Sequence, residues 1–198
     1  RVVVTKPTQT GLLPGEPGDM DEVCRLAGNV ETHEFVRLPD PLAPDAAGRR
    51  ADVHLPKVAE HAARLADIAC RGDVDVVVVE GAGGLLVRID ADGATIADLG
   101  ADLSAQGARV GYLVVAAAGL GTLNHSALTT ESLRARELDC LGLVIGSWPR
   151  DPDLAMQTNL EDLPAVTGVQ LLGCIPQGAG QWEPDAFQAS AAGWIAIT

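Results

Sequence analysis

The stretch VDVVVVEGAGG, residues 74–84, decides the fold prediction, because a β-branched apolar run ends there in a carboxylate and a group of small residues. Such a run predicts a strand that is buried on both faces. Further runs of this kind lie at residues 1–5, 110–116, 141–145 and 170–175. Near-continuous Val and Leu runs are typical of a parallel sheet whose two faces are covered by helices.

Helical patterns separate these runs. The best covers residues 56–70, with Pro56 in its first turn, Leu65 on its apolar face and Gly72 just after its end. Weaker helices are predicted at residues 21–27, 96–106, 125–138, 154–163 and 184–195, and an ordered loop at residues 39–44. The alternation predicts a doubly wound α/β fold with a mostly parallel sheet, built as a single domain over residues 1–198. Ligands then bind beyond the carboxyl ends of the strands.

The composition excludes some classes of partner. The chain has 27 Asp and Glu residues against 14 Lys and Arg residues, and its formal net charge of −13 repels nucleic-acid backbones and anionic membranes. Four widely spaced cysteines, Cys24, Cys70, Cys140 and Cys174, predict buried thiols in a reducing compartment. Because its longest apolar stretch is shorter than a membrane span, we expect a soluble cytoplasmic protein.

Glu80 is the first candidate site residue. A carboxylate at the end of a buried strand is costly unless something pairs with it, and it is also a suitable ligand for Mg²⁺. The small residues that follow, Gly81-Ala82-Gly83-Gly84, let backbone amides approach anionic oxygens, although they equally suit a tight turn. We therefore interpret Glu80 as functional.

Lys6 ends the first predicted strand and opens the segment KPTQTG, residues 6–11. A lysine at a sheet edge neutralises a phosphoryl group well, but a lone lysine is more often a solvated surface residue. Asp19 lies just before a predicted helix, where it is either a carboxylate at the same edge or an ordinary N-cap. The segment GLGTLNH, residues 119–125, precedes another helix, whose free amides suit a substrate carboxylate unless Thr122 or Asn124 caps them.

Three segments together, KPTQTG, EGAGG and GLGTLNH, resemble the dethiobiotin synthetase family along nearly the whole chain. EGAGG also occurs in related P-loop amidoligases such as cobyrinate synthases, whereas the combination with the other two segments is specific. The resemblance implies a P-loop NTPase type of fold and an ATP- and Mg²⁺-dependent cyclo-ligase of biotin biosynthesis. In that reaction CO₂ and 7,8-diaminononanoate form a carbamate, ATP phosphorylates it to a mixed anhydride, and the second amine closes the ureido ring.

The resemblance also implies roles for individual residues. Lys6 would stabilise the charge on the carbamate and the transferred phosphoryl group, Thr10 would hydrogen-bond the carbamate, and Asp19 and Glu80 would hold Mg²⁺. Further substrate contacts would come from Gly83, Leu120, Gly121 and Asn124, the last three from the second subunit of a homodimer. Nucleotide contacts would come from Asp19, Glu80, Gly81, Ala82, Gly83, Gly146, Ser147, Pro176, Gln177 and Gly178.

Two features depart from the family pattern. Family members begin with a strand, a GxxxxGK[ST] loop and a helix, and none of these precedes Arg1; we expect that about thirty residues are missing and that the chain alone is inactive. Gly146 lies where many relatives carry an Asn that reads adenine, which predicts that CTP or GTP competes with ATP. The turn at residues 176–178 resembles the other wall of the base pocket, or is a plain turn.

Two other interpretations remain open. Another amidoligase or a partitioning-type ATPase of the same fold would explain Glu80 and the glycines, but not KPTQTG together with GTLNH. A non-catalytic dimeric remnant would bind the substrate without turning it over. An assay with diaminononanoate separates the first of these from a dethiobiotin synthetase. Retained substrate binding without nucleotide binding would favour the remnant, which could also bind a partner.

Overall fold

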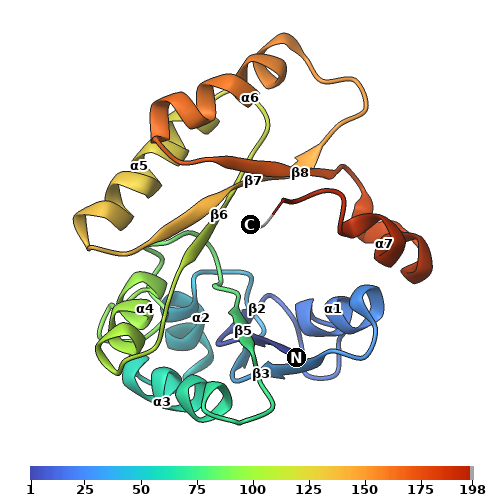
Figure 1. Cartoon of the computed structure of the whole chain (residues 1–198). Helices are drawn as coiled ribbons and strands as arrows, with labels where there is room; N and C mark the ends of the chain where they lie inside the picture. Colours follow the sequence, from blue (N-terminus) through green and yellow to red (C-terminus); the bar gives the residue numbers. More distant parts are fainter. Residues whose placement is uncertain (197–198) are drawn as a thin grey trace. The chain divides into compact units, whose positions relative to one another are not determined.

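The structure, a computed structural model, describes residues 1–196 and divides into two compact units, Arg1–Arg109 and Val110–Thr198 (Figure 1). Within the described residues both three-stranded sheets are parallel, and one or two helices separate successive strands along the chain except β1 from β2 and β3 from β4. The α/β class with parallel sheets is therefore confirmed. The single domain expected for residues 1–198 stays a prediction.

The first unit contains a three-stranded sheet of order β3-β1-β5 and a two-stranded sheet of order β2-β4. Its strands are β1 (Val2–Lys6), β2 (Gln9–Thr10), β3 (Glu31–Glu34), β4 (Arg37–Leu38) and β5 (Val76–Val79). Its helices are α1 (Asp19–Ala27), α2 (Pro44–Ala51), α3 (Val58–Ala69) and α4 (Ile96–Ala105). Because the strands are parallel, Lys6 pairs with Glu34 at one edge of the sheet, and Thr5 pairs with Val79 there.

The second unit contains a sheet of order β6-β7-β8. Its strands are β6 (Tyr112–Ala116), β7 (Cys140–Trp148) and β8 (Leu171–Pro176), and its helices are α5 (Thr122–Ala135), α6 (Leu154–Thr167), η1 (Ala179–Gln181) and α7 (Pro184–Ala191). Helices α5 and α6 pack against each other and over the sheet (Figure 1). Leu143, Ile145 and Leu163 are fully buried in the core between α6 and the strands.

Helix boundaries differ from the predictions where tertiary packing outweighs local signals. Helix α6 continues past the predicted end at residue 163 and includes Pro164, because Leu163 and Thr167 are buried and Gly168, in the left-handed conformation, ends the helix. Helix α5 begins at Thr122 and not at residue 125, and α7 ends at Ala191 and not at residue 195. The predicted loop at residues 39–44 ends where Pro44 begins α2.

The prediction of strands buried on both faces is wrong for β5 and β6. Val76 and Val78 of β5 are exposed, as are Leu113 and Val115 of β6, while the residues between them are half-buried. Within residues 1–196 each of these strands lies at the end of its sheet, so that fewer neighbours cover its alternate side chains.

The expected burial of all four thiols is also wrong. Cys24 and Cys70 are exposed, and Cys140 and Cys174 are half-buried. Cys24 lies in the short, largely exposed helix α1, and Cys70 lies at the end of α3, so neither position is covered by the core. Among residues 1–196, none of the helices combines the length and apolar character that crossing a lipid bilayer requires.

Candidate functional site

A buried ammonium group meets two carboxylates at the carboxyl edge of sheet β3-β1-β5. Lys6, the last residue of β1, is only 4% exposed. Its Nζ donates a hydrogen bond to Glu80 Oε1 at 2.9 Å and forms an ion pair with Asp19 Oδ2. Burial by itself lowers the pKa of Lys6, but the hydrogen bonds to Asp19 and Glu80 and their negative charges outweigh it and raise the pKa. Lys6 is therefore an ammonium at neutral pH.

The backbone explains why these three residues come together. The amide of Glu80 donates to Thr5 O at 2.8 Å, which extends the pairing of β5 with β1 by one residue and places Glu80 beside Lys6. Asp19 is the first residue of α1, and the N-cap is Gly18. The Gly18 amide donates to the Asp21 carboxylate at 2.7 Å, so Asp21 supplies the cap and the N-cap interpretation of Asp19 is wrong.

The two carboxylates have the character of a site for a hard divalent cation. The side chains of Asp19 and Glu80 are 45% and 51% exposed, and both point to one nitrogen atom, Lys6 Nζ. Mg²⁺ is typically bound by one or two carboxylates together with waters and substrate phosphates, and not by a cage made of protein alone. No cluster of three or more His, Cys, Asp or Glu side chains suited to a metal occurs within residues 1–196. Asp19 and Glu80 therefore fit a site at which waters and substrate phosphates would complete the coordination of Mg²⁺.

The glycine segment after Glu80 is a turn whose conformation requires glycine. Gly83 has a φ of +96°, and a Cβ at this position would lie 2.9 Å from Val87 Cγ2. The amide of Val87 donates to Gly84 O at 3.0 Å. A tight turn thus lies beside the Lys6 cluster, and the predicted phosphate contacts of Gly81, Ala82 and Gly83 stay a prediction. Thr10, the predicted carbamate contact, is the last residue of β2 and is half-buried.

In the second unit, the segment at residues 119–125 forms a loop and the start of α5. Gly121 is the N-cap, with a φ of +95° and no side chain that bonds the helix amides, so the capping interpretation for Thr122 and Asn124 is wrong. Leu120 is 95% exposed, and Asn124 is exposed as well. Buried Asn159 of α6 donates from Nδ2 to Ala118 O at 2.8 Å and thereby fixes the start of this loop, a contact that no local sequence signal indicates.

The ends of β7 and β8 differ from the prediction in one respect. Gly146 and Ser147 lie inside β7 and not after it, because the strand continues to Trp148, which pairs with Pro176 of β8. A Cβ on Gly146 would lie 2.7 Å from Val115 Cγ1, so the strand packing itself favours glycine there.

An open cavity of about 650 Å³ lies beyond these strand ends. Its lining includes Pro176 and Gln177 among the predicted nucleotide contacts; Gly146, Ser147 and Gly178 do not line it. The other lining residues are Trp148, Pro149, Arg150, Asp151, Cys174 and Trp182. Gly178 has a φ of +77° and is the N-cap of η1, and its predicted contact with the base stays a prediction. The signal that we overlooked was the indole and guanidinium of Trp148-Pro149-Arg150 directly after a predicted strand.

Comparisons with known proteins agree with the sequence motifs. The family model described as "AAA domain" matches residues 1–181. The ATP-dependent dethiobiotin synthetase BioD of Streptomyces avermitilis is 54% identical over 195 residues, which cover 98% of this chain and 79% of the relative. The proteins of the same name from Saccharopolyspora erythraea and Rhodococcus jostii are 55% and 49% identical, over 94% and 100% of this chain and 80% and 82% of theirs. The chain therefore belongs to the dethiobiotin synthetase family.

Proposed function

We propose that this protein is an ATP-dependent dethiobiotin synthetase, which closes the ureido ring of dethiobiotin from 7,8-diaminononanoate and CO₂ in the cytoplasm. The observation that carries the proposal is the buried Lys6 ammonium between Asp19 and Glu80, at the sheet edge where ligands bind in parallel α/β folds. Family membership supports ATP as the nucleotide and diaminononanoate as the substrate, and CO₂ is part of the proposal. The residue roles below are part of the proposal.

Lys6 is the proposed catalytic residue. An ammonium group has three N–H donors, and two of them are directed at Asp19 and Glu80. The third is left for an oxygen of the carbamate or of the transferred phosphoryl group, where negative charge accumulates. The carbamate oxygen attacks the γ-phosphorus and ADP leaves. The second amine then attacks the carbamate carbon, the C–O bond to phosphate breaks, and the amine proton is lost as the ring closes. The Thr10 hydroxyl orients the carbamate.

Asp19 and Glu80 are the proposed magnesium carboxylates. A Mg²⁺ held by these two carboxylates would supply positive charge to the triphosphate, beside that of Lys6, in a chain whose formal net charge is −13. The amides of Gly81, Ala82 and Gly83 face phosphate and carbamate oxygens. The nucleotide base binds at the ends of β7 and β8, beside Gly146 and Ser147 and against Pro176, Gln177 and Gly178. Arg150 and Trp148 of the cavity there offer a guanidinium and an aromatic face to the base.

The loop at residues 119–124 is the proposed receptor for the distal carboxylate of diaminononanoate. Support comes from the start of α5, where Gly121 leaves the first helix amides without a side-chain acceptor, an arrangement that favours an anion. Leu120, Gly121 and Asn124 make these contacts across a homodimer interface, and the almost complete exposure of Leu120 suits an interface residue.

Formation of dethiobiotin tests the proposal. The protein as its gene encodes it is incubated with diaminononanoate, bicarbonate, ATP and Mg²⁺, and the product is detected by mass spectrometry. We expect a product that depends on all four components. Hydrolysis of ATP that does not respond to diaminononanoate would instead indicate another amidoligase or ATPase. Binding of diaminononanoate without turnover, measured by calorimetry, would favour the non-catalytic remnant.

Nucleotide choice tests the base site separately. Gly146 has no side chain that hydrogen-bonds adenine, so we expect CTP and GTP to support turnover and to compete with ATP. The measurement is the rate of dethiobiotin formation in equimolar nucleotide mixtures. A strong preference for ATP would contradict this part of the proposal and leave the reaction itself intact.

A further inference from the structure

Residues 11–18 connect two proposed site residues, because they run from Thr10 at the end of β2 to Asp19 at the start of α1. This segment contains neither helix nor strand. Backbone hydrogen bonds from Gly11 to Asp40 O and from Leu12 to Leu38 O, at 3.1 and 3.4 Å, hold its first residues, and a Leu13–Glu16 turn follows. The position of this turn and of the loop's last residues depends on side-chain contacts from outside the loop. Any freedom in the loop passes to the Asp19 carboxylate, which meets Lys6 at the loop's end.

Arg37 of β4 supplies these outside contacts. Its Nε and Nη2 donate to the two carboxylate oxygens of Glu34 at 2.7 and 2.8 Å, and both side chains are only about one-fifth exposed, at 21% and 17%. Its Nη1 donates to the carbonyl oxygens of Leu13, at 3.3 Å, and of Glu16. A bidentate Arg–carboxylate pair has a fixed geometry, so Glu34 holds the Arg37 guanidinium in place. Arg37 in turn holds the loop at the two carbonyl groups of Leu13 and Glu16.

The end of the loop also lies against this ion pair. A Cβ on Gly18 would lie 2.9 Å from Arg37 Nη2 and 3.3 Å from Glu34 Oε2, so the Gly18 backbone is packed directly on the two side chains. Gln9, the register partner of Arg37 in the β2–β4 pair, is 5% exposed and accepts a hydrogen bond from the Asp19 amide at 3.2 Å. The residue before Asp19 and the amide of Asp19 itself are thus both fixed by β2 and β4.

We propose that Arg37 is a positioning residue that fixes the Asp19 carboxylate for divalent-cation binding. The inference rests on the proposed function of Asp19 and Glu80, and it assigns to Arg37 a part that no feature of the family motifs indicates. Arg37 acts through residues 11–18 and through Gly18, which it contacts, and not on the cation itself. Residues that orient a metal ligand typically change metal affinity about 10- to 100-fold when they are replaced.

Binding of Mn²⁺ in the presence of ATP, followed by electron paramagnetic resonance, tests the proposal in the protein as its gene encodes it. We expect Arg37→Ala to weaken Mn²⁺ binding about 10- to 100-fold. Gly18→Ala, whose Cβ would lie 2.9 Å from Arg37 Nη2 and 3.3 Å from Gln9 Oε1, crowds the guanidinium without removing its charge and weakens binding in the same direction. The matched control is Arg25→Ala, because Arg25 makes the same i,i+3 kind of pair with Glu22 on the exposed face of α1. That variant keeps its affinity within about twofold.

Hydrogen exchange of the metal-free protein gives a readout that does not depend on turnover. We expect faster exchange of the amides of residues 11–19 in Arg37→Ala, and unchanged exchange there in Arg25→Ala. Wild-type Mn²⁺ affinity in both Arg37→Ala and Gly18→Ala overturns the role of Arg37, even where dethiobiotin still forms. If Arg37→Ala fails to fold, Gly18→Ala alone decides. An unaltered protein that makes no dethiobiotin overturns the proposed function instead, and exchange of residues 11–19 then decides whether Arg37 holds the loop.

Discussion

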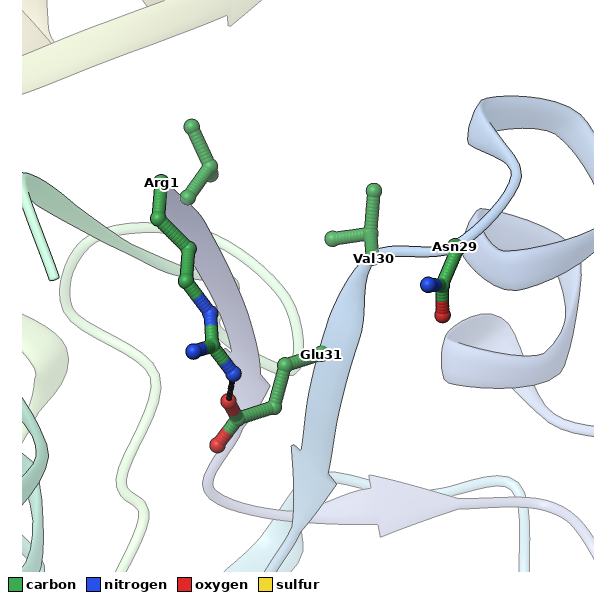
Figure 2. Close-up of a pocket in the computed structure, with 5 residues that line it drawn as sticks. Arg1, Asn29, Val30 and Glu31 are labelled. Atoms are coloured by element: carbon green, nitrogen blue, oxygen red, sulfur yellow. Dashed lines mark hydrogen bonds and ion pairs between the residues drawn. The ribbon is translucent and has the colours of Figure 1, made fainter. Parts of the chain in front are cut away.

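The two ends of sheet β3-β1-β5 both carry clusters of charged side chains, but the charges balance at only one end. At the amino end, Arg71 forms a bidentate pair with Glu31, at 2.6 and 2.9 Å, and also contacts Asp73. Arg1 pairs with the same two carboxylates, and Figure 2 shows its guanidinium against Glu31. Two guanidinium groups thus meet two carboxylates. At the carboxyl end, one ammonium meets two carboxylates, which leaves a net charge of −1.

This difference separates a structural cluster from a binding site. A balanced and partly exposed cluster gains little from a further ion, and its contribution to stability is small and sensitive to salt. The unbalanced cluster has the opposite character, since its single cation is buried and its carboxylates keep about half of their surface free. It attracts a divalent cation, whose charge would offset the repulsion between these carboxylates and the anionic triphosphate.

Removal of the buried cation has the largest expected effect. Lys6→Met keeps the length of the side chain and removes the charge, and we expect kcat for dethiobiotin formation to fall about 100- to 1,000-fold, the usual cost of losing one group that stabilises charge in the transition state. Arg71→Met, at the opposite end of the same sheet, is the matched control and leaves kcat within about twofold. Equal losses in the two variants would show that the ends of the sheet do not differ as we describe.

Removal of one carboxylate has the next largest effect. Glu80→Gln leaves Lys6 with Asp19 as its partner and removes one of two cation ligands, so we expect the Mg²⁺ concentration for half-maximal activity to rise at least about tenfold, equivalent to ~1.4 kcal/mol. The comparison is Asp73→Asn at the amino end, for which the Mg²⁺ dependence stays unchanged. Both variants are titrated with Mg²⁺ at saturating ATP. An unchanged midpoint in Glu80→Gln would exclude Glu80 as a ligand.

The sequence predicts the carboxyl end better than the amino end for a physical reason. Lys6 and Glu80 each follow an apolar β-branched run, and parallel strands bring such chain positions to one edge. Strand β3 has the sequence ETHE, which has no apolar periodicity, so its pairing with β1 was not predicted. The contacts of Glu31 with Arg71 and of Arg37 with the 11–18 loop depend on that register and on β2–β4 pairing. Local patterns carry no information about them.

A stability change at the amino end is expected to be smaller than either effect on function. Arg71→Ala removes the bidentate ion pair with Glu31, so that Glu31 keeps its contacts with Arg1 and His33. We expect Tm to fall by about 1 to 3 °C, as for other partly exposed ion pairs, with most of the difference lost at 1 M NaCl. Differential scanning calorimetry at low and high salt measures it. A loss of activity at a temperature where the variant is folded would contradict the assignment of this end to structure alone.

The smallest expected effect is the pH dependence of the stability that Glu31 contributes at the amino end of the sheet. Hydrogen bonds from Arg71 and His33 lower the pKa of Glu31 from 4.5 to about 2. Because the folded-state pKa is the lower one, Glu31 contributes stability above pH 4.5, and this contribution is lost as the pH falls from about 4.5 to about 2. The Tm difference between the unaltered protein and Glu31→Gln should therefore shrink steadily as the pH falls from about 4.5 to about 2. Glu22→Gln on α1 serves as the comparison, because a hydrogen bond from Arg25 lowers the pKa of Glu22 without a contribution from a histidine. A Glu31→Gln difference that keeps its full size at pH 2.5 would mean that the contact acts through packing and not through charge.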